Sequence, residues 1–193
     1  MVGAVEGDHP TAPDQGPELQ GALERGPQVA PGVQDERRKV EPPRHVDDIV
    51  AALDICRSFD VPLLMRGGGT SQNGQCVNVA VVIDTSKYLN RVLSIDPANR
   101  TAVVQPGAVC DALRDAAEQH ELTFGPDPAT HSRCTLGGMI GNNSCGAHSV
   151  MAGKTAENIE ALEVLTYDGA RFWVGPTDDA EFGRIIAAGG RQA

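Results

Sequence analysis

The residues best suited to chemistry in this sequence are glycines that stand beside small hydroxyl side chains. The segment Arg66-Gly67-Gly68-Gly69-Thr70-Ser71 follows directly on a short apolar run. Because glycine has no Cβ, three in succession let backbone amides approach an anion, and Thr70 and Ser71 add hydroxyl donors. The segment therefore predicts a phosphate-binding loop. For a triple glycine taken alone, a flexible turn is the alternative.

The spacing of these glycines differs from that of the two common nucleotide-binding loops. It does not match G-x-G-x-x-G, and no helical pattern starts at Gly69, so a Rossmann-type dinucleotide site fits poorly. It also lacks the G-x-x-x-x-G-K-[ST] pattern of Walker-type NTPases. The phosphate-binding loop must then be of another kind.

A second glycine-rich segment, residues 133–146, alternates glycines with small polar residues around a short apolar stretch, 136–140. This composition indicates backbone that packs closely on a flat ligand. Two such segments, well separated in the chain, are expected to grip opposite ends of a long dinucleotide. Two coincidental glycine-rich loops are the alternative.

Hydrophobic periodicity predicts the elements that must position these segments. Apolar residues at i, i+3, i+4 and i+7 from Val46 predict a helix, and apolar runs predict buried strands at 61–65 and 79–83. Two antiparallel hairpins are expected, the second around Asp168-Gly169. The hairpins are predicted at 91–95 with 101–105 and at 159–166 with 171–174. The remaining helices are predicted at 109–118 and 177–188. The stretch 124–143 is expected to be a long Gly/Pro/polar segment with a short apolar core at 136–140.

Composition limits the class of protein. A formal net charge of -10 and an aromatic content of 4% argue against nucleic acid as a partner. No apolar stretch is long enough to span a bilayer and no signal peptide is visible, so we expect a cytoplasmic protein without a transmembrane segment. The cysteines are odd in number and form no C-x-x-C pair, so we expect reduced, mostly buried thiols and no metal site. A disulfide or a metal role is the alternative.

Residues 1–39 differ from the rest of the sequence. They contain many of the 13 prolines, no aromatic residue and almost no apolar periodicity. Such a composition cannot bury enough apolar surface to offset the entropy of ordering. We therefore expect a disordered or non-native N-terminal segment at 1–39, with a docking tail as the alternative, and a cofactor-binding domain at 40–193.

Further motifs give the sequence a family resemblance. With Gly74-Gln75, Val104-Gln105-Pro106-Gly107 and Phe124-Gly125-Pro126-Asp127-Pro128, the two glycine-rich segments resemble those of FAD-linked oxidases of the vanillyl-alcohol oxidase superfamily. The likeness covers residues 41–191 and is strongest to bacterial FAD-dependent D-lactate or D-2-hydroxy acid dehydrogenases with a C-terminal iron–sulfur region. It implies an α+β fold with a PCMH-type FAD-binding domain. A small βαβ subdomain would be followed by a mixed or antiparallel sheet subdomain with helices, with FAD between them.

The resemblance also implies which residues hold the cofactor. The loop around the triple glycine would bind the pyrophosphate through Met65, Arg66, Gly67, Gly68, Gly69, Thr70, Ser71 and Gly74. The flavin and its phosphate–ribitol chain would lie along Pro126, Asp127, His131, Cys134, Thr135, Gly137 and Gly138. The same wall would continue through Asn142, Asn143, Ser144 and Cys145, and the backbone of Ile159 would touch the adenine end. His131 is expected near the cofactor rather than as the substrate base, and the catalytic residues stay unknown.

The implied activity is oxidation of a small 2-hydroxy acid such as D-lactate by hydride transfer to the flavin, with a quinone, a cytochrome or an iron–sulfur region as electron acceptor. The family continues with an E-G-T-L type motif, a substrate-binding cap and a histidine-rich site, whereas this sequence stops at Ala193. We therefore expect an inactive, C-terminally incomplete fragment. The alternative is a non-catalytic flavin- or nucleotide-binding module that acts with a partner chain.

Overall fold

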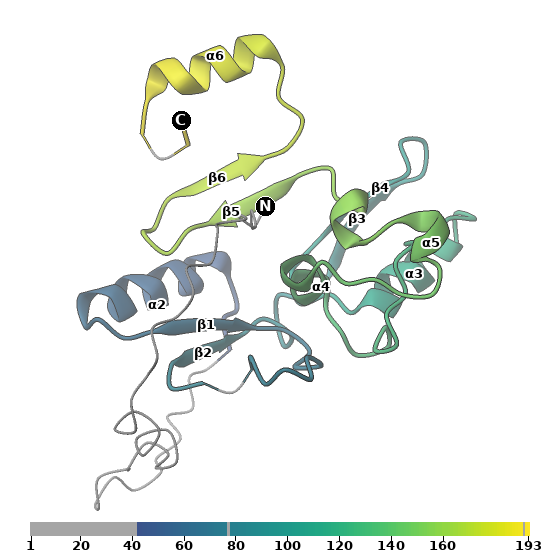
Figure 1. Ribbon diagram of the computed structural model, residues 1–193, viewed down its shortest axis with the longest axis horizontal. Helices are drawn as coiled ribbons and strands as arrows, with labels where there is room; N and C mark the ends of the chain where they lie inside the picture. Colours follow the sequence, from purple (N-terminus) through teal and green to yellow (C-terminus); the bar gives the residue numbers. More distant parts are fainter. Residues whose placement is uncertain (1–41, 77, 191) are drawn as a thin grey trace, which may run out of the picture. The chain divides into compact units, whose positions relative to one another are not determined.

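The computed structural model describes residues 42–76, 78–190 and 192–193. All of them belong to one compact unit, Val40–Ala193. Residues 1–39 lie outside the described part, so the expectation of disorder there stays a prediction. In chain order (Figure 1) the elements are α2 (Val46–Ser58), β1 (Leu63–Arg66), β2 (Val81–Asp84), β3 (Val92–Asp96), β4 (Thr101–Val104), α3 (Cys110–Glu118), α4 (Leu136–Asn142), α5 (Ser149–Ala152), η1 (Thr155–Asn158), β5 (Leu162–Leu165), β6 (Arg171–Val174) and α6 (Asp179–Ala188).

The first part of the fold is the helix α2 followed by two parallel strands. The Asp48 carboxylate accepts hydrogen bonds from the backbone N–H groups of Arg44 and His45, which holds the first turn of α2. Strands β1 and β2 pair from Leu63↔Val81 to Arg66↔Asp84. The triple glycine therefore begins at the edge where Asp84 ends β2. The strand that a βαβ unit needs before α2 would fall at or before residue 41, outside the described residues.

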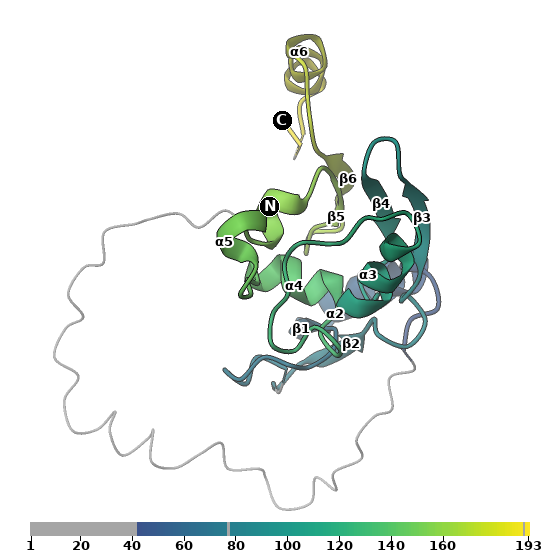
Figure 2. The same cartoon turned by 90° about the vertical axis from the view of Figure 1, so that its right-hand side faces the viewer.

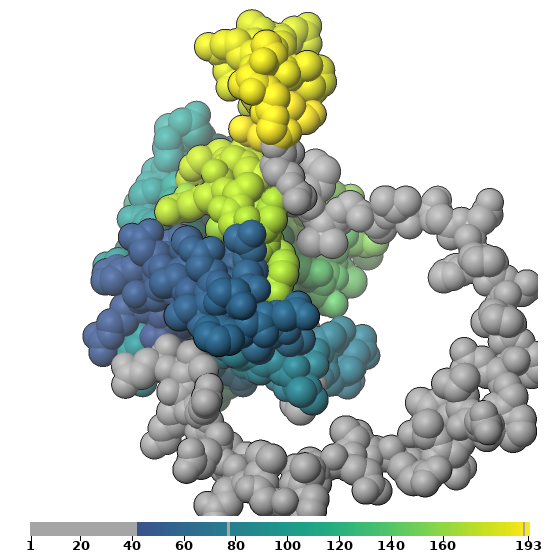
Figure 3. Space-filling view, turned by 90° about the vertical axis from the view of Figure 1, so that its left-hand side faces the viewer, coloured from purple at the N-terminus to yellow at the C-terminus, as the bar shows by residue number. Residues whose placement is uncertain are grey.

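An apolar cluster joins this part to the C-terminal hairpin. Ile49, Ile83 and Leu89 form the buried centre, and Leu165 of β5 packs against it. Figure 3 shows the side chains of α2 directly against those of the β5–β6 hairpin, where Arg171 lies 3.7 Å from the Asp47 carboxylate. Burial of this cluster is what holds α2 and the hairpin together.

The second part of the fold is the β3–β4 hairpin with α3 and α4. The two strands are antiparallel with an irregularity between Val92 and Ser94, and Asp96 accepts two backbone hydrogen bonds that close their turn. Figures 1 and 2 both place α3 beside α4. Between them lies a second buried cluster, made by Ala108, Cys110, Leu113, Cys134, Leu136 and Met139.

The last elements are the antiparallel β5–β6 hairpin and α6. The hairpin turns at Asp168-Gly169, as predicted from that dipeptide. Helix α6 begins at the capping side chain of Asp178 and buries none of its residues, so Phe182 is 59% and Ile186 49% exposed. No helix in the described part of the chain is long and apolar enough to cross a membrane.

Helix α4 was not expected, because 124–143 read as a Gly/Pro/polar segment. Glycines at 137, 138 and 141 disfavour a helix. Tertiary contacts override that preference: Leu136 and Met139 are buried in the second cluster, and the first amides donate to backbone carbonyls of another segment. The helix ends at Asn143, which has a left-handed φ of 46°.

Candidate cofactor site

The two glycine-rich segments meet. A Cβ added at Gly67 would lie 2.0 Å from the hydroxyl oxygen of Thr135, and one added at Gly68 would lie 2.2 Å from the carbonyl oxygen of Arg133. Neither position has room for a side chain. The two segments form one continuous backbone surface at this point, and their grip on opposite ends of a dinucleotide stays a prediction.

Residues 106–109 hold the second segment in place. The amides of Leu136 and Gly137 donate to the carbonyl oxygens of Ala108 and Pro106, both over 2.8 Å. A Cβ at Gly137 would lie 2.9 Å from Pro106, and Val109 forms an antiparallel bridge with Thr135. The Pro-Gly motif after β4 thus fixes the start of α4.

Thr135 leaves a polar atom without a partner at this junction. Thr135 is 1% exposed, and its hydroxyl oxygen makes no hydrogen bond to any described residue. A buried hydroxyl without a partner is unfavourable by about 1–3 kcal/mol. A ligand oxygen beside Gly67 and Gly138 would supply the missing hydrogen bond, so this position fits a phosphate or ribityl group.

Arg66 and Gly69 form the rim of the first segment. Gly69 has φ +66°, a left-handed conformation that favours glycine, and a Cβ there would lie 2.5 Å from the Arg66 guanidinium. That guanidinium forms an ion pair with Asp84, its register partner on β2. The pair neutralises part of the Arg66 charge, so Arg66 supports the loop, and its role toward an anion stays a prediction.

Asp84 is ionised in this arrangement. Partial burial raises the pKa of its carboxyl, but hydrogen bonds from Ser86 and the charge of Arg66 outweigh that effect and bring the pKa below its ordinary value of 3.8. The Ser86 amide and hydroxyl donate to it over 2.9 and 2.6 Å. A permanent carboxylate therefore anchors Arg66 at neutral pH.

The rest of the first segment is open. Met65 is 46% exposed on β1, and Thr70 is partly buried while Ser71 is exposed. Ser71 bonds Gln75 within the loop, and Gly74 takes φ +79° with no atom within 4 Å of its Cβ position. These residues are accessible to a ligand, and their cofactor role stays a prediction.

Pro126 and Asp127 belong to the wall of the second segment. Pro126 is fully buried, and its carbonyl oxygen lies 3.6 Å from the Cys110 sulfur. The Asp127 carboxylate accepts hydrogen bonds from the backbone N–H of His148, over 3.0 Å, and from its ring. The His148 ring bond is the main cause that lowers the pKa of Asp127 below its ordinary value. Gly146 packs against the Asp127 carbonyl, 2.0 Å from its Cβ position.

His131 is oriented by a carboxylate that sequence reasoning missed. Its Nδ1 lies 2.7 and 2.8 Å from the two carboxylate oxygens of Asp111, and Arg114 lies 3.7 Å from the same group. The His131 side chain is 43% exposed, which leaves its Nε2 as the nitrogen that can meet a ligand. A His–Asp pair of this kind can hold or transfer a proton.

The end of α4 is bound to η1, which leads to Ile159. The Asn143 carboxamide oxygen accepts the Ala156 amide over 3.0 Å, and the Ser144 carbonyl accepts both the backbone amide and the hydroxyl of Thr155, over 3.0 and 2.7 Å. The structure thus brings Asn142, Asn143 and Ser144 close to the segment of Ile159. Cys145 is exposed beside them.

The partners missed by sequence reasoning are Asp84 and Asp111, which hold Arg66 and His131. Asp84 ends an apolar strand. Asp111 lies in the first turn of a helix, where an acidic residue is common because it interacts favourably with the helix dipole. A cleft of about 390 Å³ lies elsewhere, between β6 and α6. None of the predicted cofactor residues lines that cleft.

Comparison with known proteins defines the class of protein. The FAD binding domain family matches residues 39–175, so the chain belongs to that family and its cofactor is FAD, as predicted. D-2-hydroxyglutarate dehydrogenase of Pseudomonas putida is 36% identical over 77% of this chain. Glycolate oxidase subunit GlcD of Escherichia coli is 32% identical over 69% of it. The resemblance to FAD-linked oxidases is confirmed.

The fold is found in a solved structure as well. 6-Hydroxy-D-nicotine oxidase of Arthrobacter nicotinovorans superposes with a TM-score of 0.62 at 18% identity, over 69% of this chain and 29% of the other. This likeness supports the α+β, PCMH-type fold. The chain spans 15% of the length of the D-2-hydroxyglutarate dehydrogenase and 27% of that of the glycolate oxidase subunit.

Proposed function

We propose that this chain is the FAD-binding part of an oxidoreductase that oxidises a small 2-hydroxy acid. The observation that carries the proposal is the junction of the two glycine-rich segments. There, Gly67 and Gly68 leave no room for side chains, and the buried hydroxyl of Thr135 has no partner among the described residues. A backbone surface of this kind suits the phosphate–ribityl part of a dinucleotide.

Named residues of both segments would hold the cofactor. Backbone amides of 67–69, with the hydroxyls of Thr70 and Ser71, would donate to the pyrophosphate, and Thr135 with its neighbouring glycines would follow the ribityl chain. Arg66, held by Asp84, would support this loop. Bound FAD supplies a hydride acceptor, and the protein supplies its orientation and electrostatic surroundings.

The substrate class is proposed from the relatives. A D-2-hydroxyglutarate dehydrogenase and a glycolate oxidase subunit both bear the names of 2-hydroxy acids. D-Lactate is a further candidate of the same chemistry, and a quinone, a cytochrome or an iron–sulfur region is the proposed electron acceptor. We also propose a cytoplasmic location, since five reduced cysteines fit a reducing compartment.

The test of the cofactor assignment is release of the ligand. The purified chain should be yellow, and heat denaturation should release a compound that chromatographs as FAD and not as FMN. Apoprotein should regain its colour with FAD but not bind NAD. A folded, colourless protein that ignores added FAD would contradict the proposal.

A second candidate is a non-catalytic FAD-binding module that works with a partner chain. The exposed apolar residues of the C-terminal part favour it, because Trp173 and Phe182 are 60% and 59% exposed. The two candidates differ in one measurement. If the chain is joined to the C-terminal region of the Pseudomonas putida D-2-hydroxyglutarate dehydrogenase, bleaching of the bound flavin by a 2-hydroxy acid supports the oxidoreductase. A flavin that no hydroxy acid bleaches in that fusion supports the module.

A further inference from the structure

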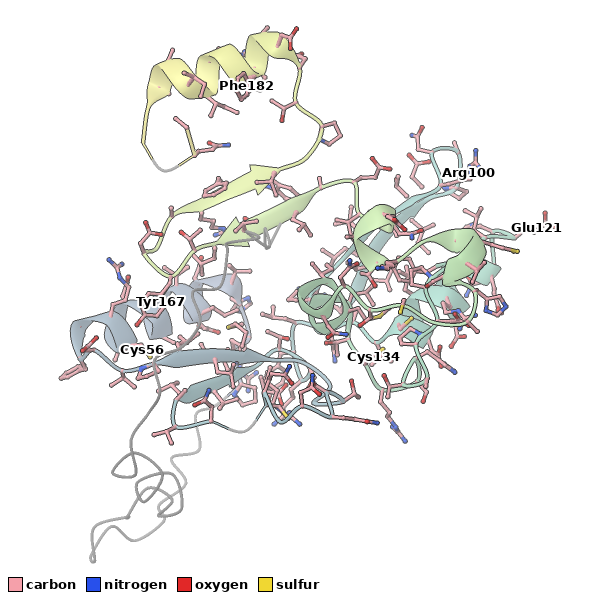
Figure 4. The ribbon with its side chains drawn as sticks, in the orientation of Figure 1. Cys56, Arg100, Glu121, Cys134, Tyr167 and Phe182 are labelled. Carbon is pink, nitrogen blue, oxygen red and sulfur yellow. The ribbon has the colours of Figure 1, made fainter. Side chains whose placement is uncertain are left out.

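Two cysteine side chains are neighbours beneath the candidate cofactor site. Cys110 begins α3 and Cys134 directly precedes Thr135, and both lie in the second buried cluster, 0% and 6% exposed. The Cys110 amide donates to the Cys134 carbonyl over 3.0 Å, next to the antiparallel bridge Val109↔Thr135. Opposed residues of an antiparallel pair place their side chains on the same face. Figure 4 shows Cys134 among the side chains between α3 and α4.

The two thiols differ in their affinity for a proton. A hydrogen bond from the Cys110 thiol is the main cause that lowers the pKa of Cys134 to about 7, and the Thr130 hydroxyl and the nearby His131 add to it. The same bond and burial raise the pKa of Cys110 far above its ordinary value. At neutral pH the pair therefore combines a partly ionised, nucleophilic sulfur with a protonated neighbour, as reactive dithiols do.

We propose that Cys110 and Cys134 form a reversible disulfide on exposure to hydrogen peroxide, and that this disulfide weakens FAD binding. The Cys134 thiolate attacks one peroxide oxygen, the O–O bond breaks, and with one proton the products are a sulfenic acid and water. The Cys110 sulfur then attacks the Cys134 sulfur and displaces its hydroxyl, which leaves as water with the Cys110 proton. Two thiols and one peroxide give one disulfide and two waters, and a dithiol reductant reverses the reaction.

Both sulfurs are coupled to the cofactor segments. The Cys110 sulfur lies 3.6 Å from the Pro126 carbonyl oxygen, and a disulfide that moves this sulfur changes that contact. A disulfide also draws the two sulfurs to about 2.05 Å, closer than a hydrogen bond between thiols allows. Cys134 then shifts Thr135, which has no free space against Gly67. The effect on FAD rests on the proposed function, whereas the disulfide itself does not.

The mass measurement uses the full chain with Cys76→Ser and Cys145→Ser, which removes the two more exposed thiols, and the FAD measurement uses the unsubstituted chain. After treatment with hydrogen peroxide, the intact mass should fall by two hydrogens, and peptide mapping should find Cys110 linked to Cys134. Cys56, buried on α2, should stay a free thiol and serves as the internal control. FAD affinity should fall at least tenfold and return with dithiothreitol.

Variants separate the two parts of the proposal. Cys110→Ser, which keeps a hydrogen-bond donor beside Cys134, should stop the reaction at a dimedone-reactive sulfenic acid on Cys134, without the cross-link. Oxidation of the parent chain only to Cys134 sulfinic acid, or a cross-link to Cys56, would overturn the disulfide. An intact disulfide with unchanged FAD affinity would overturn its effect on the site. If the reduced chain does not bind FAD at all, the proposed function fails, and the mass measurement still decides the disulfide.

Discussion

The hydroxyl oxygen of Thr135 lies so near Gly67 that a Cβ at residue 67 would be 2.0 Å from it. This contact joins β1 to α4 across more than sixty residues of sequence and sets the position of both glycine-rich segments. No rotation of a flexible side chain can relieve it, because Thr135 is buried and β-branched. The contact makes residue 67 a sensitive position of the candidate site.

Gly67→Ala should therefore destabilise the fold by about 1–3 kcal/mol, the usual effect of overpacking. It should also lose FAD at concentrations that saturate the parent chain. Urea unfolding and flavin absorbance measure the two effects. The matched control is Gly183→Ala on α6, where no atom lies within 4 Å of the added Cβ. Adding Thr135→Ala to Gly67→Ala should recover part of the stability. A Gly67→Ala chain that is as stable as the parent and saturated with FAD would refute the contact.

Gly68→Val should abolish flavin retention for a reason that the sequence does not contain. A positive φ is not involved, since the left-handed glycine is Gly69. The obstacle is the Arg133 carbonyl, 2.2 Å from the Cβ position, and backbone cannot move aside as a side chain can. Already Gly68→Ala should lower the flavin content of the purified protein. Equal flavin in Gly68→Val and Gly183→Val would show that the triple glycine is only a turn.

The strands and hairpins could be predicted because their signals are local. Alternation and apolar runs marked β1 to β6, and Asp168-Gly169 marked the last hairpin turn. Helix α4 could not, since its glycines disfavour a helix and its stability comes from burial of Leu136 and Met139. The ion partners Asp84 and Asp111 could not either, because they face Arg66 and His131 only once strands and helices have packed.

Asp84→Asn tests the ion pair through its pH dependence. The pKa of Asp84 is lower in the folded chain than its ordinary value of 3.8. Its contribution to stability is therefore present above about pH 4 and is lost as the pH falls through the folded pKa. Asp84→Asn should be less stable than the parent at pH 6 and should lose less stability between about pH 4 and 2.5. Urea midpoints across this pH range measure the difference in stability, with Asp115→Asn on α3 as control. If the midpoints of Asp84→Asn and the parent fall in parallel with pH, the role of Asp84 is contradicted.

Limited trypsin digestion tests the proposed division at residue 39. We expect cleavage after Arg25 and Arg37 before any site within the compact unit that begins at Val40, because exposed chain without a core is cut first. The shortened chain should keep its FAD. Protection of both arginines in the native protein would contradict the division.

The FAD-loaded chain alone should not oxidise 2-hydroxy acids. Hydride transfer needs the substrate held in near-attack geometry and its hydroxyl proton taken by a positioned base. The chain spans 15% and 27% of the length of two relatives named for such substrates. Its described His–Asp pairs are His131 with Asp111 and His148 with Asp127, and neither has been assigned a substrate. Anaerobic mixing with D-2-hydroxyglutarate, glycolate and D-lactate should leave the flavin absorbance unchanged, while dithionite, as the positive control, should bleach it.

Rapid bleaching by a hydroxy acid would contradict this expectation. Loss of that bleaching in His131→Gln, with FAD still bound, would then identify His131 as the base.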